Sequence, residues 1–420
     1  MNRKEKMPSI RYEGFTDDWE QRKLGELSER LIVGLATSVT PYYRNEGTPI
    51  LRNLNIKENY LDDSDILFLD DEYADGQAGK KIHTGDVLTV HTGYIGTSCI
   101  VPEKYDGCLT FTTLITTTNS TKLNGEFLSQ YLNSEMGLSA VQMVTTQGGR
   151  QNLNTNDFVN VPIPHPSIDE QKKICDILRN FDNLITLHQR KYDKLVKLKK
   201  SLLVKMFPQE GANVPEIRFE GFTDDWEQCK LSELATMHAR IGWQNLRTSE
   251  FLDQGDYMLI TGTDFDDGKI NYSTCHYVEK ERYDQDPHIQ IQNGNILITK
   301  DGTLGKVAYV QGLEMPATLN AGVFNVEIRD ENYVDGKYLF QYLKAPFLMN
   351  YVSQKATGGT IKHLNQNILV DFPVVLPSKA EQEKIGQYFD SLDNLITLHQ
   401  CKLKRLKDLK HSMLNKMFPN

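Results

Sequence analysis

The sequence predicts an α+β protein in which two mixed α/β domains are separated by two long antiparallel helices forming a coiled coil, with an internal pseudo-two-fold repeat. Duplicated stretches are the first observation behind this prediction. Residues 10–27 read IRYEGFTDDWEQRKLGEL and residues 217–234 read IRFEGFTDDWEQCKLSEL, identical at 15 of 18 positions. Residues 182–189 recur unchanged at residues 393–400, and the offset between copies drifts from 207 to 211 residues. The chain is therefore a duplication with small insertions.

Between these stretches the two copies share only a skeleton of glycines, apolar residues and prolines. Residues 82–88 (IHTGDVL) align with residues 291–297 (IQNGNIL), and residues 125–132 (GEFLSQYL) align with residues 336–343 (GKYLFQYL). Shared glycines and apolar positions mark turns and core, so they indicate one common fold. The remaining positions differ. We therefore expect one scaffold that presents two different surfaces.

Five consecutive segments follow from this pattern. They are a first domain at residues 1–166, a long helix at 167–208, a linker at 209–216, a second domain at 217–377 and a second long helix at 378–420. Within the domains, β-branched runs predict strands and apolar periodicity predicts helices. The expected strands are residues 86–90, 111–118, 295–299, 306–310 and 323–329, and the expected domain helices are residues 126–144 and 337–354.

Each long helix has a marked start, an apolar stripe and a marked end. Residues 167–170 (SIDE) and 378–381 (SKAE) fit the S-x-x-E capping box, and Pro208 and Pro419 end the helical stretches. The stripe residues that we expect to form the spacer and to dock partner subunits are Leu184, Leu195, Leu202, Leu395, Leu406 and Met413. At ~1.5 Å per residue each helix spans roughly 55–60 Å. That length favours pairing of the two helices over the alternative, in which each packs only on its own domain.

Charge is distributed unevenly along the chain. The net charge is −9, which counts against nucleic-acid binding if it is taken globally. However, residues 188–205 hold seven Lys/Arg and one acid, and residues 399–416 hold six Lys/Arg and one acid. No apolar run approaches the ~20 residues that span a bilayer, and the N-terminus lacks an apolar signal region. We expect no membrane association and a location in the bacterial cytoplasm.

The sequence contains no convincing catalytic or metal-binding motif. The sequence contains no G-x-x-x-x-G-K-[ST] loop and no G-x-G-x-x-G fingerprint. Residues 170–172 (EQK) resemble a nuclease E-x-K, but the other copy has EQE at residues 381–383. The six cysteines form no C-x-x-C pair, so we expect reduced thiols and no metal site. The chain is therefore expected to be no enzyme and to hold no cofactor of its own.

Both domains end in the passage P-[IV]-[PV]-x-P-S-x-x-E-Q-x-[KE]-I, at residues 162–174 and 373–385, and both long helices end in KMFP. This duplicated arrangement resembles the DNA-specificity (S) subunit of type I restriction–modification systems, over nearly the whole chain. The resemblance implies that each domain is a target-recognition domain reading one half of a bipartite, asymmetric DNA target. It further implies that the helices set the unread spacer between the halves.

Partner proteins also follow from the resemblance. The helices would dock two modification subunits, which bring S-adenosylmethionine and methylate adenine. Two restriction subunits, ATP- and Mg-dependent translocating nucleases, would join to cut double-stranded DNA. A non-DNA interaction scaffold with two diverged binding domains remains the alternative, and the net negative charge is its best support.

Candidate DNA-reading residues are those whose side chains suit base edges or phosphates. Two glycine-hinged regions per domain are rich in them: residues 89–94 and 147–152 in the first, and residues 299–303 and 357–363 in the second. The first-domain candidates are Arg44, Arg52, Asn53, Asn55, His91, Thr92, Tyr94, Gln147, Arg150, Gln151 and Asn152. The second-domain candidates are Arg240, Trp243, Gln244, Asn245, Arg247, Lys300, Thr303, Lys306, Thr360, Lys362 and His363. Plain surface turns are the alternative interpretation of these regions.

Overall fold

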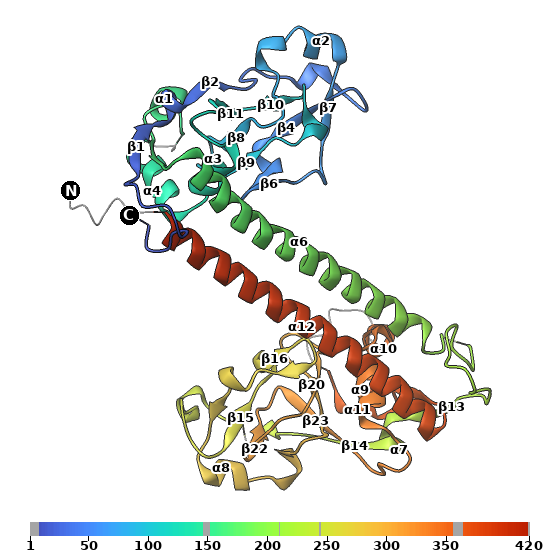
Figure 1. Cartoon of the computed structure of the whole chain (residues 1–420). Coiled ribbons are helices and arrows are strands. Elements are labelled where there is room, and N and C mark those ends of the chain that lie inside the picture. The colour runs from blue at the N-terminus through green and yellow to red at the C-terminus, as the bar shows by residue number, and fades with distance from the viewer. Residues whose placement is uncertain (1–7, 146–151, 210, 243–244, 356–363, 419–420) are drawn as a thin grey trace. The chain divides into compact units, whose positions relative to one another are not determined.

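The computed structural model describes residues 8–145, 152–209, 211–242, 245–355 and 364–418. The chain forms two compact units, which we call unit 1 (Met1–Gln189 with Cys401–Asn420) and unit 2 (Arg190–Gln400). Each unit contains one globular domain and part of each long helix, as the colouring of Figure 1 shows. The two long helices are therefore shared between the units rather than forming separate segments.

Unit 1 is built around two four-stranded sheets. The first, with the order β2-β11-β8-β9, is antiparallel throughout, and the second, with the order β10-β4-β7-β3, contains the parallel pair β10 and β4. The strands of the first sheet are β2 (Ser28–Val33), β8 (Val87–Val90), β9 (Ser98–Ile100) and β11 (Thr113–Thr118). Those of the second are β3 (Tyr43–Arg44), β4 (Thr48–Arg52), β7 (Leu67–Leu69) and β10 (Leu109–Phe111).

Unit 2 repeats this plan. Its first sheet has the order β14-β23-β20-β21 and its second the order β18-β15-β22-β19. The strands of the first sheet are β14 (Ala235–Ala239), β20 (Ile296–Thr299), β21 (Val307–Tyr309) and β23 (Val323–Ile328). Those of the second are β15 (Met258–Ile260), β18 (His276–Tyr277), β19 (Gln290–Ile291) and β22 (Ala317–Leu319). The matching order of the first sheets confirms that the duplicated sequence encodes one fold twice.

Smaller elements complete both units. The two-stranded sheets are β1 (Glu20–Lys23) with β12 (Pro162–His165), β5 (Ile56–Lys57) with β6 (Tyr60–Leu61), β13 (Glu227–Lys230) with β24 (Pro373–Leu376), and β16 (Phe265–Asp266) with β17 (Lys269–Ile270). The short helices are α1 (Leu24–Leu27), α2 (Asp71–Asp75), α5 (Thr155–Phe158), α7 (Leu231–Leu234), α8 (Lys280–Asp284) and α11 (Gln366–Val370).

Each domain helix expected from the sequence is in fact a pair of helices. In unit 1, α3 (Gly125–Leu132) ends before Ser134, whose side chain caps α4 (Glu135–Val144) by accepting a hydrogen bond from the Gly137 amide. In unit 2, α9 (Gly336–Lys344) and α10 (Pro346–Lys355) are separated at Ala345. A proline cannot continue an α-helix but suits its first turn, so Pro346 begins a new one. The expectation of a single helix was wrong in both units.

The expected strand at residues 111–118 is also divided. The structure ends β10 at Phe111 and begins β11 at Thr113. Thr112 between them has φ of 47°, in the left-handed region that interrupts a strand. The other four expected strands are confirmed within one or two residues, as β8, β20, β21 and β23.

The two long helices are α6 (Ile168–Lys205, 38 residues) and α12 (Lys379–Met417, 39 residues), which confirms both expected helices. Within each unit their segments run antiparallel, and a lysine of one helix meets an aspartate of the other. Lys410 Nζ lies 2.6 Å from Asp182 in unit 1, and Lys199 Nζ lies 2.6 Å from Asp393 in unit 2. The two pairs occupy equivalent positions of the repeat. They fix the register of the helices in each unit.

A domain glutamine completes each of these polar contacts. Gln130 of α3 donates from Nε2 to Asp182 at 3.1 Å, and Gln341 of α9 donates to Asp393 at 2.9 Å. We call Gln130, Asp182 and Lys410 the unit 1 triad. Its counterpart, the unit 2 triad, is Gln341, Asp393 and Lys199. Each triad joins two helices and one domain through a single carboxylate.

The apolar stripe differs in part from the expected one. Leu202 is buried, and Leu195, Leu406 and Met413 are half-buried, but the Leu184 and Leu395 residues are 44% and 45% exposed. Each of these two leucines follows a triad aspartate by two positions. At about 100° per residue, this spacing turns the leucine to nearly the opposite side of the helix. Because the aspartates face the partner helix, the leucines face away from it.

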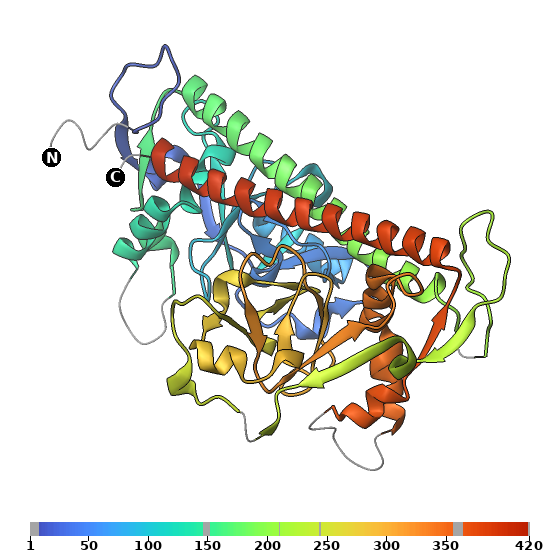
Figure 2. The same ribbon diagram turned by 90° about the horizontal axis from the view of Figure 1, so that it is seen from below.

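Aromatic side chains at the helix ends anchor the helices in the domain cores. Phe418, which follows α12, packs edge-on against Phe127 and Tyr131, with ring centroids 5.4 and 5.3 Å apart. Ile10 donates its amide to the Lys416 carbonyl at 3.0 Å. In both Figure 1 and Figure 2 the last turns of α12, in red, lie beside the start of the chain, in blue. Residues from both ends of the chain therefore complete unit 1.

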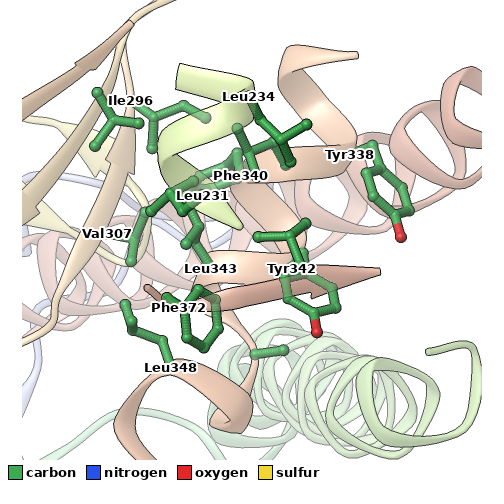
Figure 3. Packing of buried hydrophobic residues seen from close by; sticks show 14 of the residues in the cluster. Leu231, Leu234, Ile296, Val307, Tyr338, Phe340, Tyr342, Leu343, Leu348 and Phe372 are labelled. Atoms are coloured by element: carbon green, nitrogen blue, oxygen red, sulfur yellow. The ribbon is translucent and has the colours of Figure 1, made fainter. Parts of the chain in front are cut away.

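The core of unit 2 has the same design. Phe207, which follows α6, packs against Tyr342 with centroids 5.3 Å apart and stacks on Phe389 at 6.0 Å. Tyr342 also lies against Phe372, 5.9 Å away, as Figure 3 shows. Phe207 and Phe389 are fully buried. The repeated KMFP sequence thus places one phenylalanine in the core of each unit.

The glutamates of the expected capping boxes have a different role. The helix starts are confirmed, and the Glu170 amide approaches Ser167 Oγ at 3.4 Å. The Glu170 carboxylate, however, binds Arg11 through two hydrogen bonds of 2.6 and 2.8 Å. In unit 2, Arg218 binds the Glu381 carboxylate through two of 2.8 Å. A buried carboxylate needs a cation as its partner, and this requirement overrides the capping geometry.

The triads yield a stability prediction. Asp393→Ala should lower the free energy of unfolding by about 3–5 kcal/mol, because it leaves the buried Lys199 ammonium without its carboxylate. Burial, reinforced by Lys344, already lowers the pKa of Lys199. The double variant Lys199→Met/Asp393→Leu should recover most of the loss. Urea unfolding followed by circular dichroism measures both, with the exposed Lys200→Met as control. Equal losses in the single and double variants would contradict a role for the unpaired charge.

Candidate nucleic-acid interface

In each domain the same backbone hydrogen bond joins one predicted reading region to the leucine that follows the other region in the sequence. In unit 1 the Leu153 amide donates to the His91 carbonyl at 2.9 Å, and in unit 2 the Leu364 amide donates to the Lys300 carbonyl at 2.9 Å. Leu153 and Leu364 therefore lie against the turns that follow β8 and β20. Several predicted residues lie outside the described part of the chain: Gln147, Arg150, Gln151, Trp243, Gln244, Thr360, Lys362 and His363.

Three predicted residues of unit 1 come together at this junction. Asn53 donates from Nδ2 to Thr92 Oγ1 at 3.1 Å and accepts from Thr113 Oγ1 at 3.1 Å. Thr92 in turn forms an isolated β-bridge with Asn152, whose side chain is exposed. We call Asn53, Thr92 and Asn152 the unit 1 polar cluster. Its amide and hydroxyl groups have the chemistry that reads base edges.

The neighbouring His91 and Tyr94 differ in character. Burial lowers the pKa of His91, so its ring is neutral at pH 7 and supplies no charge to a phosphate. Tyr94 is 88% exposed and lies in the turn between β8 and β9, where Gly93 and Gly96 both have positive φ. Only Tyr94 of this pair is presented fully to solvent.

The other candidates of unit 1 are held by intramolecular contacts. Arg44 is exposed and pairs with Asp70 at 3.2 Å, whereas the half-buried Arg52 pairs with Asp65 at 2.8 Å. Asn55 is buried, accepts a hydrogen bond from the Arg52 amide and donates to the Asp65 carbonyl. Asn55 therefore shapes the loop, and its burial contradicts the expectation that it contacts DNA directly.

In unit 2 the turn between β20 and β21 carries a basic cluster. Thr303 and Lys306 are exposed, and Lys300 Nζ lies 5.5 Å from the centre of the Phe324 ring. Thr299 Oγ1 accepts a hydrogen bond from the Lys306 amide at 2.9 Å, which fixes the turn from inside. Lys300, Thr303 and Lys306 occupy the place in unit 2 that the Thr92 and Tyr94 turn occupies in unit 1. The shared scaffold thus presents cations in one unit and neutral groups in the other.

Arg240 is buried, which contradicts its prediction as a base-contacting residue. The side chain is 1% exposed and donates to the Leu319 carbonyl at 2.9 Å, to Gln285 Oε1 at 3.1 Å and to Thr318 Oγ1 at 3.2 Å. A guanidinium has five donors in a fixed fork, so it can join several segments at once. Arg240 therefore supports the second sheet and the start of the following loop.

The loop that Arg240 supports carries the remaining candidates. Asn245 and Arg247 are exposed on it, and Arg282 Nε donates to Glu250 at 2.7 Å near its end. In unit 1 the matching position is Gly34, where an added Cβ would lie 2.2 Å from Thr110 Oγ1. The two domains therefore route this loop differently. Unit 1 holds the loop through a close backbone approach at Gly34, and unit 2 holds it through the buried guanidinium of Arg240.

Neither a metal site nor a membrane segment is found in the described residues. Within them, no group of three or more His, Cys, Asp and Glu side chains could hold a metal ion. No helix in the described ranges combines the length and the apolar character needed to cross a membrane. Burial raises the pKa of Cys108 to about 11 and of Cys275 to about 12, so both thiols are protonated at pH 7. The exposed candidate residues of the two domains are instead mainly hydrogen-bonding and cationic side chains.

Two solved structures share this architecture. The S subunit of a type I restriction–modification system from M. genitalium superposes with a TM-score of 0.65 at 15% identity, covering 99% of both chains. A chain described under complex assembly and conformational transition of the type I R-M system gives a TM-score of 0.53 at 19% identity, covering 97% of this chain and 100% of that chain. These similarities show the two-domain fold.

Sequence relatives carry the same description. The type I restriction enzyme MjaVIII specificity subunit of Methanocaldococcus jannaschii is 23% identical over 420 residues, covering 95% of this chain and 92% of that protein. The EcoBI specificity subunit of Escherichia coli is 21% identical over 309 residues, covering 67% of this chain and 62% of that protein.

The family model for the type I restriction modification DNA specificity domain matches residues 16–197 and again residues 223–408. The two matches coincide with the two copies of the duplication and cover most of both units. The predicted resemblance is thereby confirmed. The chain belongs to the type I restriction–modification specificity family, whose members are the non-catalytic, DNA-recognising subunits of the complex.

Proposed function

We propose that this specificity subunit reads a bipartite, asymmetric DNA target, with the domain of unit 1 on one half and the domain of unit 2 on the other. One observation carries the proposal: the same turn of the same scaffold bears different side chains in the two units. On this turn unit 1 offers Thr92 and Tyr94, with Asn53 bonded to Thr92, and unit 2 offers Lys300 and Thr303. Amides and lysines suit different bases in the major groove. Two such faces on one chain fit two different half-sites.

The long helices would set the spacer and dock two modification subunits. Exposed leucines support this second step, because they recur at equivalent positions of both copies. Leu187 and Leu398 are each 46% exposed, and Leu184 and Leu395 are 44% and 45% exposed. Exposed apolar patches commonly mark interfaces. Two equal apolar surfaces fit two copies of one partner.

The complex would divide its chemistry among its subunits. The modification subunits would bring S-adenosylmethionine and methylate adenine, and two restriction subunits would use ATP and Mg to translocate and cut double-stranded DNA. All of this would take place in the bacterial cytoplasm. The specificity subunit would supply DNA recognition and would set the distance between the half-sites.

Single-molecule methylation sequencing of DNA from cells that express the complex tests the bipartite reading. We expect a split motif with one modified adenine in each half and an unread gap of constant length. Footprinting of the purified complex should then protect both halves. A single contiguous motif, or no sequence-specific protection at all, would overturn the proposal and favour a protein-interaction scaffold.

Docking on the helices can be tested one site at a time. Leu395→Asp should release one of two modification subunits, because a buried carboxylate without a partner opposes association. Leu184→Asp should do the same on the other copy, and the double variant should bind neither. Native mass spectrometry gives the stoichiometry directly. Asn394→Asp and Asn183→Asp add the same charge at adjacent exposed positions and serve as matched controls. Full occupancy in the double variant would exclude this surface.

Substitutions at Arg240 and Arg247 should affect different properties, the first the stability of the chain and the second its recognition of DNA. Arg247→Ala removes an exposed side chain, so it should leave folding intact and weaken only the second half-site, by roughly 1–3 kcal/mol if Arg247 contacts a base. Arg240→Met removes the buried donors and should lower the melting temperature of the chain. Binding to duplexes altered in either half, together with calorimetry, distinguishes the two. An unchanged melting temperature for Arg240→Met would refute its structural role.

A further inference from the structure

Unit 1 contains an apolar cleft of about 550 Å³ beside the turn that carries Tyr94. Its floor is formed by Ile56 and Val90, which are buried. Its walls are Leu54, Tyr60 and Tyr94, which are 48%, 59% and 88% exposed. Three large apolar side chains that line one open cleft are unusual on a surface without a ligand.

The Tyr60 wall of this cleft is fixed by the fold. Tyr60 begins β6, the second strand of a hairpin whose turn residue Asn59 has φ of 65°. Asn59 Oδ1 accepts hydrogen bonds from Ser129 Oγ and Asn133 Nδ2, both at 2.9 Å, which tie the hairpin to α3 and to the residue after it. This wall is therefore in place before a ligand arrives, which reduces the ordering required on binding.

The equivalent place in unit 2 has the opposite character. There the hairpin β16–β17 and the glycine turn carry Thr263, Lys269 and Thr303 where unit 1 has Leu54, Tyr60 and Tyr94. Lys269 Nζ donates to Thr397 Oγ1 at 3.1 Å. The apolar cleft is thus a property of one domain and not of the shared scaffold. A ligand that bound both units in the same way would give no reason for this difference. The cleft therefore fits a ligand that only unit 1 binds.

The cleft is continuous with the unit 1 polar cluster. Asn53 lies on its rim and is the residue that binds Thr92, which bridges to Asn152. The rim also carries Lys57 and Glu58. A ligand in the cleft would therefore have flat apolar faces, a polar edge and a position next to the residues that read DNA. A nucleobase has this chemistry.

We propose that the cleft of unit 1 holds one nucleobase of the first half-site outside the base stack, with the Tyr94 ring stacked on its face. The inference rests on the proposed reading of that half-site by unit 1. Aromatic side chains stack on any base, so Tyr94 supplies affinity, while Asn53, Lys57 and Glu58 face the polar edge and select among bases. Leu54 and Tyr60 exclude water from the opposite side.

The experiment uses the specificity subunit assembled with its modification subunits. The probe is a duplex of the target sequence with 2-aminopurine placed in turn at each position of the first half-site. We expect increased fluorescence on binding at one position that is not the methylated adenine, because a 2-aminopurine outside the base stack is no longer quenched by its neighbouring bases. Tyr94→Ala should abolish the increase and weaken binding to the target about tenfold. Tyr94→Phe keeps the ring and should keep both. Glu103→Ala, at an exposed position of unit 1 outside the cleft, should leave the signal intact.

The outcomes separate this inference from the proposed function. If the wild-type complex protects two half-sites but Tyr94→Ala binds the target equally well, only the cleft assignment fails. Loss of the modification subunit from Tyr94→Ala, seen by size-exclusion chromatography, would make the cleft a protein-docking surface and overturn the assignment. An equal loss of affinity for target and unrelated duplexes would also overturn it. If the wild-type complex shows no split target, the proposed function itself fails.

Discussion

A single carboxylate in each unit binds two helices and a domain at once. Asp182 accepts from Lys410 of the other helix and from Gln130 of the domain, and Asp393 repeats the arrangement. Helix register and domain attachment therefore depend on the same atoms. A slip of either helix would leave Lys199 or Lys410 without its carboxylate partner, and removing one partner of a buried pair costs about 3–5 kcal/mol. Within each unit this frame does not use the surface loops, which can therefore differ between the domains.

Divergence between the two domains is confined by this frame to positions that it does not need. Where unit 1 passes a loop tightly over Thr110 through Gly34, unit 2 supports the corresponding loop with the buried Arg240. Both solutions leave the first sheet and its helices unchanged. Aromatic packing fixes the core, whereas local hydrogen bonds fix the loops. One fold can therefore present different side chains on its two domain surfaces.

Much of the architecture could be predicted from the sequence because duplication, helix caps and apolar periodicity are local signals. The positions of the long helices followed from them. Side-chain roles that depend on a partner far along the chain did not: Glu170 binds Arg11 instead of capping its helix, and Leu184 faces away from the helix pair. For the interface, residue type suggested Asn55 as a reader, but only the fold shows that it is buried. Tyr60 carried no sequence signal, because exposure cannot be read from an isolated tyrosine.

Unit 1 is assembled from segments far apart in the chain, since Leu414, Met417 and Phe418 join a core whose other buried apolar residues all precede Gln189. During synthesis on the ribosome, the first domain is finished hundreds of residues before this phenylalanine emerges. Until then Phe127 and Tyr131 lack their contact with Phe418, and the nascent domain exposes an apolar surface. Such a surface binds chaperones and promotes aggregation. Loss of residues 414–418 would therefore damage the part of the protein that was translated first.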